Sequence, residues 1–280
     1  MLVFFDDILI YNRSWKDHLQ HVDRVLKLLE EKQLYAKTSK CFFGVQEGEY
    51  LGHIVSHEGV KVDPNKIKAI KEWKFPTTIK QLRGFLGLTG YYRKFLKNYG
   101  RISTPLTTLL KKDAFSWAPK ETNSFKHLKE AMCQAPVLST PDFKKTFIVE
   151  GDALRNRIGA VLMQEGRPIA FESIPIKGKY LEKAIYKKEM LAIFHAVKEW
   201  RTYLMGRHFK VKMIMIVLNT FWNKYYLQKS SKNGSQRCWV MNLKSSTKKG
   251  SKMLLQMHSQ ERMRMWKNFF VSFLLCSQIG

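Results

Sequence analysis

The chain has 280 residues, long enough for one large or two small domains with sizeable cores. Lys and Arg number 49 against 23 Asp and Glu, so the formal net charge of +26 attracts nucleic acid or anionic lipid and excludes an acidic or neutral protein. Because 45% of the residues are hydrophobic and 13% are aromatic, a disordered basic tail is excluded. The composition indicates a folded protein that binds polyanions.

The sequence predicts an intracellular protein, in the cytoplasm or nucleus and not secreted. The 4 cysteines lie far apart without a CxxC pair, which disfavours a disulfide framework and a zinc knuckle. The N-terminal segment carries acids and no basic leader, so it is a poor signal peptide. The apolar run FFVSFLLC has about half the length needed to cross a bilayer, so we expect no membrane partner.

The character of the sequence changes near residue 213. Residues 213–280 hold 11 Lys and Arg and a single acid, Glu261, together with 7 of the 12 methionines. This segment shows neither helical nor strand periodicity, whereas the preceding sequence shows both.

The first half of the patterned sequence predicts hairpins and then helices. An apolar run broken by two acids is followed by a helix from Ser14 to about Lys32. The apolar spacing of this helix predicts a buried stripe of Trp15, Leu19, Val22, Leu26 and Leu29. Residues 49–62 indicate two short strands joined around His57-Glu58-Gly59. Helical patterns then cover residues 65–73, 78–99, 104–112 and 120–132.

The second half of the patterned sequence predicts mainly strands. They are expected at 146–153, 157–164 and 167–173, before a helix from about Leu181 to Leu204 and a strand at 208–213. The element order predicts an α+β or α/β fold in which hairpins, an all-helical middle and a β-β-β-α-β module follow one another.

Asp6 and Asp7 form the first candidate site. Ionised carboxylates within an apolar strand are costly unless a cation or hydrogen-bond donors compensate them. Adjacent strand residues point to opposite faces, so both acids serve one site only at a tight hairpin. A solvated turn between two strands explains the pair equally well.

Asp152 and Glu189 form the second candidate site. Asp152 ends a predicted strand, and Glu189 shares one helical face with Tyr186, Ile193, Val197, Trp200 and Leu204. A carboxylate on a core-facing stripe near another at a strand end is typical of divalent metal sites for phosphodiester cleavage. The alternative is an edge glutamate paired with a nearby lysine.

These residues carry a family resemblance. Phe4-Phe5-Asp6-Asp7 resembles the Y/F-x-D-D signature of reverse transcriptases. In order, YLGHIVSHEGVKVDPNKI, LRGFLGLTGYYRKFLKNYG, PLTTLLKKDAFSW, IGAVLMQEGRPIAF and EMLAIFHAVKEWRTYLMGRHF resemble the polymerase–RNase H segment of gypsy-type LTR retrotransposon Pol polyproteins. The resemblance covers residues 1 to about 212.

The resemblance implies four regions. They are the C-terminal part of a reverse transcriptase palm with the FFDD hairpin, a helical thumb or connection, a truncated RNase H-like domain and a poorly structured basic tail, at 1–64, 65–140, 141–212 and 213–280 respectively. The family carries fingers and a further palm strand before the hairpin, so we expect this chain to be truncated at its N-terminus.

The resemblance also implies site residues and partners. Asp6, Asp7, Asp152 and Glu189 would be catalytic and would bind Mg²⁺ or Mn²⁺. The partner would be an RNA–DNA hybrid or a template–primer duplex, with dNTP as the only small molecule in the intact family enzyme. Nucleic-acid contacts would come from Leu51, Gly52, His53, Lys80, Arg83, Gly84, Arg93, Lys94 and Lys97. The basic members of this set fit a solvated helix face equally well.

The third RNase H acid is absent from its expected place. The family reads T-D-x-x-S-L after the strand that matches HFKVK, but this chain reads MIMIVL. Translated one frame over, Met213 and Ile214 force Asp, and the next codons permit D-H-D-S-L. We therefore interpret residues 213–280 as out-of-frame translation.

The sequence predicts a retrotransposon reverse transcriptase/RNase H fragment that is catalytically defective. Loss of one preorganised group from such a site commonly costs about 10² or more in rate. The alternatives are a non-catalytic nucleic-acid-binding remnant and a non-functional pseudogene product.

Overall fold

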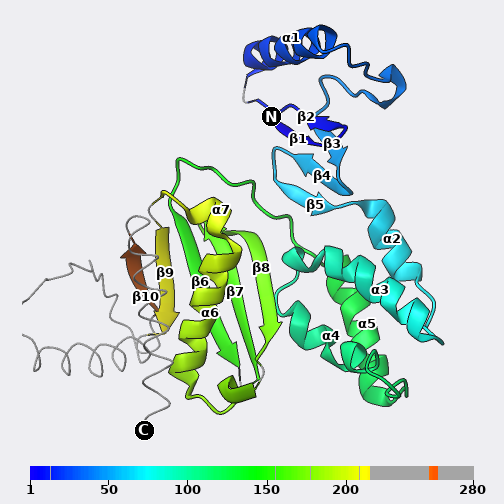
Figure 1. Ribbon diagram of the computed structural model, residues 1–280, viewed down its shortest axis with the longest axis vertical. Coiled ribbons are helices and arrows are strands. Elements are labelled where there is room, and N and C mark those ends of the chain that lie inside the picture. The colour runs from blue at the N-terminus through cyan, green and yellow to red at the C-terminus, as the bar shows by residue number, and fades with distance from the viewer. Residues whose placement is uncertain (13, 155, 177, 208, 215–251, 258–280) are drawn as a thin grey trace, which may run out of the picture.

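A computed structural model describes residues 1–12, 14–154, 156–176, 178–207, 209–214 and 252–257. Three sheets and a group of helices follow one another along the chain (Figure 1). No helix among the described residues is long and apolar enough to span a bilayer.

The N-terminal region is a hairpin followed by an amphipathic helix. Strands β1 (Leu2–Phe4) and β2 (Asp7–Leu9) pair antiparallel. Helix α1 (Trp15–Glu31) begins where predicted, because the Ser14 hydroxyl accepts the backbone N–H of Asp17. A short 3₁₀ helix, η1, covers Thr38–Lys40.

The prediction of a buried stripe on α1 is wrong. None of its residues is buried, and the Trp15 side chain is 62% exposed. The periodicity identified the apolar face correctly, but that face packs on no core within the described part of the chain.

A three-stranded antiparallel sheet follows. Its strands are β3 (Glu47–Tyr50), β4 (His53–Ser56) and β5 (Val60–Val62). The turn at residues 57–59 is where the sequence placed it. The expected pair of strands is a trio, because a second tight turn at Leu51-Gly52 divides the first predicted strand.

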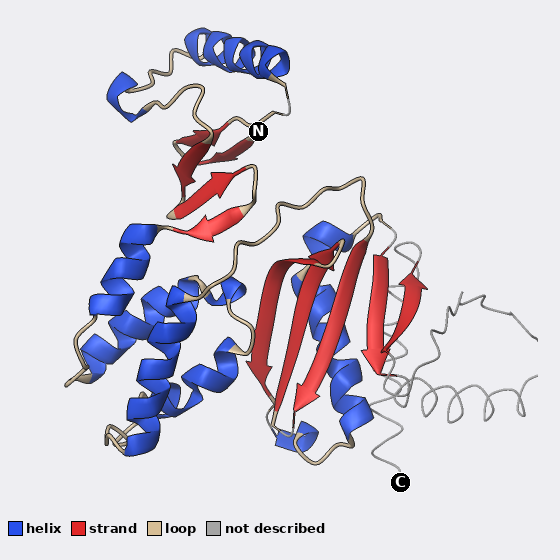
Figure 2. Cartoon of the chain, turned by 180° about the vertical axis from the view of Figure 1, so that it is seen from behind, coloured by secondary structure: helices blue, strands red, loops and turns tan. Residues whose placement is uncertain are grey.

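Four α-helices build the middle region (Figure 2). Helix α2 (Pro64–Glu72) is capped by Asp63, α3 (Ile79–Tyr91) by Thr78, and α4 (Tyr99–Thr108) and α5 (Pro119–Cys133) follow. The helix expected over 78–99 is shorter than predicted, since a 3₁₀ turn, η2 (Arg93–Phe95), and a left-handed Asn98 interrupt it. The helices share a core that includes Ile70, Leu82, Phe85, Leu106 and Leu128.

The C-terminal sheet has the order β10-β9-β6-β7-β8. Its first three strands in sequence, β6 (Phe147–Leu154), β7 (Arg157–Gln164) and β8 (Arg167–Pro175), are antiparallel neighbours, and β9 (Phe209–Ile214) runs parallel to β6. Helix α6 (Ile185–Glu199) crosses one face, preceded by η3 (Gly178–Tyr180) and followed by α7 (Arg201–Leu204) (Figure 1). This is the predicted β-β-β-α-β order.

The tail contains one described strand. Strand β10 (Lys252–Met257) pairs antiparallel with β9, which the sequence did not predict. The rest of the predicted basic tail after Ile214 lies outside the described residues.

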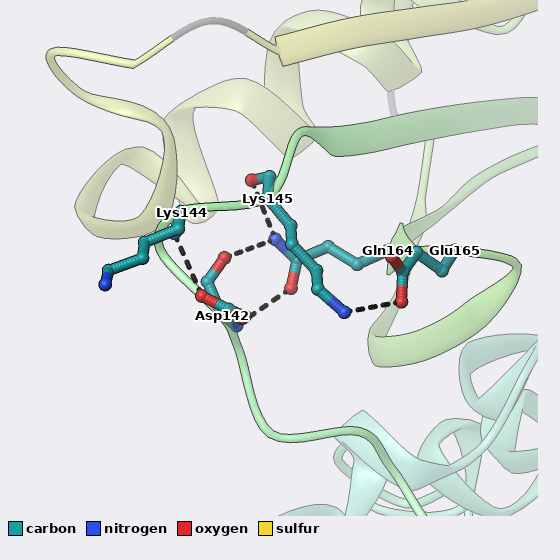
Figure 3. A network of polar contacts seen from close by, with 5 residues as sticks. All are labelled: Asp142, Lys144, Lys145, Gln164 and Glu165. Atoms are coloured by element: carbon teal, nitrogen blue, oxygen red, sulfur yellow. Dashed lines mark hydrogen bonds and ion pairs between the residues drawn. The ribbon is translucent and has the colours of Figure 1, made fainter.

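A polar network fixes the segment that leads into β6 (Figure 3). The buried Gln164 side chain accepts the Asp142 backbone N–H at 2.9 Å and donates to the Asp142 and Lys145 carbonyls at 2.8 and 3.0 Å. Asp142 in turn accepts the Lys144 N–H, and Lys145 pairs with Glu165 at 2.7 Å. These bonds set the start of β6, and β6 carries Asp152.

Candidate functional site

The two carboxylates at the first hairpin lie at a tight turn. Phe4 pairs with Asp7 across the hairpin, so only Phe5 and Asp6 form the loop. Phe5 has a left-handed φ of 50°, which is unusual for a bulky residue. Asp6 and Asp7 are both exposed, an arrangement that suits a cation site and a solvated turn alike.

Asp152 and Glu189 come together from different elements. Asp152 is exposed near the end of β6, and Glu189 is only 3% exposed on the face of α6 that covers this strand. Burial, reinforced by the negative charge of Asp152, raises the pKa of Glu189 to about 7 from 4.5. Among the described residues, Glu189 Oε2 has no hydrogen-bond partner. The helical spacing therefore identified a carboxylate that is buried beside a second one.

Gly151 allows this close approach of helix and strand. A Cβ at residue 151 would lie 2.5 Å from Ile193 Cδ1 and 3.5 Å from Ala192 Cβ. Ile193 is one helical turn beyond Glu189, so the spacing at Gly151 also sets the distance from Glu189 to Asp152.

The donor set at this pair fits a hard divalent cation. Carboxylate oxygens are the ligands that Mg²⁺ prefers, and a buried carboxylate without a donor is stabilised by a positive charge. Within the described ranges, no group of three or more His, Cys, Asp or Glu side chains converges on one point. The pair therefore offers two protein ligands.

The Leu51-Gly52-His53 segment forms a turn, here named the grip turn, that two tyrosines hold. Leu51 and Gly52 have left-handed φ values of 50° and 68°. The Tyr91 hydroxyl donates to the Leu51 carbonyl, and the Tyr92 hydroxyl donates to the Gly52 carbonyl, both at 2.8 Å. The end of α3 thus fixes the turn, and sequence reasoning missed both tyrosines.

Within the grip turn, the His53 side chain packs inward against the helical region. Its ring contacts the rings of Tyr91, Tyr92 and Phe95, and Nδ1 lies 2.7 Å from the Leu51 carbonyl oxygen. Burial and the nearby Lys94 ammonium lower the pKa of His53. His53 is only 7% exposed, so its ring stabilises the turn from the buried side, and the nucleic-acid contact expected for this segment stays a prediction.

The exposed face of α3 carries the predicted basic residues. Lys80 and Arg83 are exposed one turn apart. At Gly84, a Cβ would lie 3.4 Å from the Trp73 ring, whereas at Gly87 it would meet nothing within 4 Å. Both glycines are exposed, so the predicted contact at Gly84 stays a prediction, and Gly87 adds a second open position on the same face, at helical spacing from Lys80.

The remaining predicted contacts lie after α3. Arg93 Nη2 is 3.9 Å from Glu172 Oε2, so this guanidinium faces β8. Lys94 lies 5.4 Å from the centroid of the Phe95 ring, and desolvation lowers the pKa of Lys94. Lys97 is exposed. Arg93 thus pairs with an acid of the C-terminal sheet.

Comparison with known proteins decides the family. Residues 1–55 match the family "Reverse transcriptase (RNA-dependent DNA polymerase)" and residues 117–211 match "RNase H-like domain found in reverse transcriptase". The Pol polyprotein from transposon 297 of Drosophila melanogaster is 42% identical over 212 residues, covering 75% of this chain and 20% of the relative. The chain belongs to the LTR retrotransposon Pol family.

Other Pol relatives support the same assignment. The Pol polyprotein from transposon gypsy of Drosophila melanogaster is 37% identical, covering 73% of this chain and 21% of the relative. The Tf2-3 polyprotein of Schizosaccharomyces pombe is 34% identical, covering 73% and 16%. This Pol chain spans about a fifth of the length of the curated relatives it matches.

Solved structures confirm the reverse transcriptase-like fold. The foamy viral protease–reverse transcriptase in complex with double-stranded DNA has a TM-score of 0.68 at 19% identity, covering 82% of this chain and 45% of the other. The foamy viral complex with an RNA/DNA hybrid has a TM-score of 0.67 at 18% identity, covering 85% and 37%. The α+β class and the family predicted from the sequence are confirmed.

Proposed function

We propose that this Pol segment binds an RNA–DNA hybrid or template–primer duplex but cleaves or extends it only slowly. The observation that carries the proposal is the buried Glu189 carboxylate beside Asp152, with Oε2 unsatisfied among the described residues. Similar foamy viral structures hold double-stranded DNA or RNA/DNA hybrid, which supports nucleic acid as the partner. Family membership implies the use of divalent metal.

The nuclease pair would hold the cation through Asp152 and Glu189. A bound divalent ion supplies Lewis-acid stabilisation of phosphate oxygens and a more acidic water. Near neutral pH, the raised pKa leaves Glu189 partly protonated, so cation binding displaces a proton from its carboxyl group. Asp152, being exposed, is accessible to solvent and to the cation.

Turnover would be poor because the third family acid is absent. Its expected place holds Met213 and Ile214, neither of which is a metal ligand. At the first hairpin, Asp6 and Asp7 would contribute two carboxylates that hold the divalent ions of nucleotidyl transfer. Loss of one group from a preorganised site lowers the rate by about 10² or more.

The duplex would lie along α3 and the grip turn. Lys80 and Arg83 would neutralise phosphates, and the exposed backbone at Gly84 and Gly87 would allow sugars to approach. The two tyrosine hydrogen bonds hold the grip turn at the end of this helix. This arrangement requires no sequence-specific contact.

Binding tests this function directly. We expect Lys80→Glu/Arg83→Glu to weaken binding of a labelled RNA–DNA hybrid by about tenfold or more and to reduce its salt dependence, because phosphate contacts release counterions. Fluorescence anisotropy at several salt concentrations measures both. The control Lys68→Glu/Lys71→Glu changes the same charge at the same spacing on α2.

Three results would oppose the proposal. Equal loss in both charge-reversal variants would show that only net charge matters. Weak binding by the wild type would favour a translated product without a selected partner. Cleavage of the hybrid in Mg²⁺ that Asp152→Asn abolishes would show that the nuclease is active.

The absent acid is explained by a reading-frame shift near residue 213. We expect the encoding DNA, read one frame over, to spell D-H-D-S-L from Met213 onward. Sequencing the locus tests this, and any other text in that frame removes the explanation.

A further inference from the structure

Contacts at two places join the C-terminal sheet to the earlier regions of the chain. The segment after α5 pairs with the edge strand of the three-stranded sheet. Val60 N donates to Leu138 O at 2.7 Å, and Leu138 N donates to Val60 O at 2.8 Å. Leu138 is 2% exposed and belongs to the helical core. The segment that follows α5, here called the linker, therefore adds one residue, Leu138, to the edge of this sheet, and the buried Leu138 side chain holds it there.

Gly59 makes this pairing possible. It is buried, has a φ of 140°, and a Cβ there would overlap the Leu138 carbonyl oxygen. That oxygen belongs to the backbone, so a rotamer change cannot remove the overlap. Any side chain at residue 59 would push the linker away from β5.

The beginning of β8 joins the same place. Ser139 N donates to Pro168 O at 2.8 Å, and Arg167 Nη2 donates to Glu58 O at 2.6 Å. The linker, the turn before β5 and the start of β8 thus meet at one point. This point is called the first junction.

The end of β8 makes a second junction with the helical region. A Cβ at Gly100 of α4 would lie 2.9 Å from Ser173 O and 2.8 Å from Arg157 Nη1. Nearby, Arg93 of η2 pairs with Glu172, and Phe171 packs against the helical core. From Arg167 to Ser173 a strand extends about 20 Å, so the two junctions are well separated.

We propose that Gly59 and Gly100 are positioning residues that fix the distance between the grip turn and the Asp152–Glu189 pair. One attachment point would leave a pivot, whereas two separated points along a strand restrict rotation to the axis that joins them. Modules within a chain usually move relative to each other unless their interface is large. That this distance lets one duplex contact both the grip turn and the Asp152–Glu189 pair rests on the proposed function. That the two junctions fix the distance does not depend on it.

Double electron–electron resonance, which measures the distance between two spin labels, tests the proposal on the full chain without nucleic acid. The labels go on cysteines introduced at Glu49 of β3 and Glu199 of α6, both exposed, with the native cysteines changed to serine. We expect a single narrow distance distribution. Gly100→Leu is expected to shift or broaden it, because the side chain must displace the Ser173 backbone.

Gly87→Leu is the matched control. It adds the same side chain to a helical glycine with open space around it, so the distribution should stay narrow. If Gly100→Leu fails to fold by circular dichroism, Arg93→Ala/Arg167→Ala removes the arginine contacts of both junctions and should broaden the distribution.

A broad wild-type distribution overturns the proposal, as does a narrow, unshifted one in a folded Gly100→Leu variant. Failure of duplex binding with a narrow wild-type distance would remove the proposed function and leave the two junctions intact. The two ideas therefore fail separately.

Discussion

Glu189→Gln is expected to make the protein more stable at pH 8 but not at pH 4. The folded-state pKa of Glu189 is raised to about 7, above its usual 4.5, so the fold favours the protonated carboxyl. Its favourable contribution is complete below pH 4.5 and is lost as the pH rises through 7. The shift corresponds to about 3 kcal/mol of unfolding free energy, as an order of magnitude.

Urea denaturation in EDTA at both pH values measures this effect. The difference in unfolding free energy between the variant and the wild type isolates the titration of Glu189. Glutamine stays neutral at both pH values, and the other titrating groups are common to both proteins. Glu199→Gln, at an exposed position of the same helix, is the control and should show no such difference. A Glu189→Gln effect that is the same at pH 4 and pH 8 would contradict the burial of this carboxylate beside Asp152.

Gly151→Ala is expected to destabilise the C-terminal domain and to weaken cation binding. The new methyl group would lie 2.5 Å from Ile193 Cδ1 and 3.1 Å from Ile193 Cγ1, in a core where Ile193 is 2% exposed. Overpacking of this kind costs about 1–3 kcal/mol. Relief of the contact moves α6 outward and Glu189 away from Asp152.

The control for Gly151→Ala is Gly159→Ala. Gly159 pairs with Asp152 across β6 and β7, and a Cβ there would have contacts of 3.7 and 3.9 Å, which are ordinary. We expect its unfolding free energy and its Mn²⁺ affinity to match wild type. If both variants behave alike in urea denaturation and in Mn²⁺ titration, close packing at Gly151 has no special role.

Local sequence patterns predicted the order of helices and strands and one carboxylate of the Asp152–Glu189 pair. Helical spacing placed Glu189 on a core-facing stripe, and the structure confirms that it is buried. The same reasoning failed for α1, because amphipathic spacing shows that a helix has an apolar face but not which surface covers it. Trp15 is accordingly exposed.

Contacts between distant segments could not be predicted from local patterns. Tyr92 reaches the grip turn across 40 positions of sequence, and Gly59 meets Leu138 after an entire helical region. Gly84 was predicted from the family resemblance, whereas the open space at Gly87 depends on which residues pack around α3. The missed residues are those whose roles depend on tertiary packing.

The proposed nuclease site requires Asp152 and Glu189 to share one divalent cation. Titration of the protein with Mn²⁺, followed by electron paramagnetic resonance of the free ion, measures it most directly. We predict a Mn²⁺ site that Mg²⁺ displaces, that Asp152→Asn and Glu189→Gln each remove, and that Glu199→Gln retains. Mn²⁺ binding that is unchanged in Asp152→Asn and in Glu189→Gln would contradict the claim.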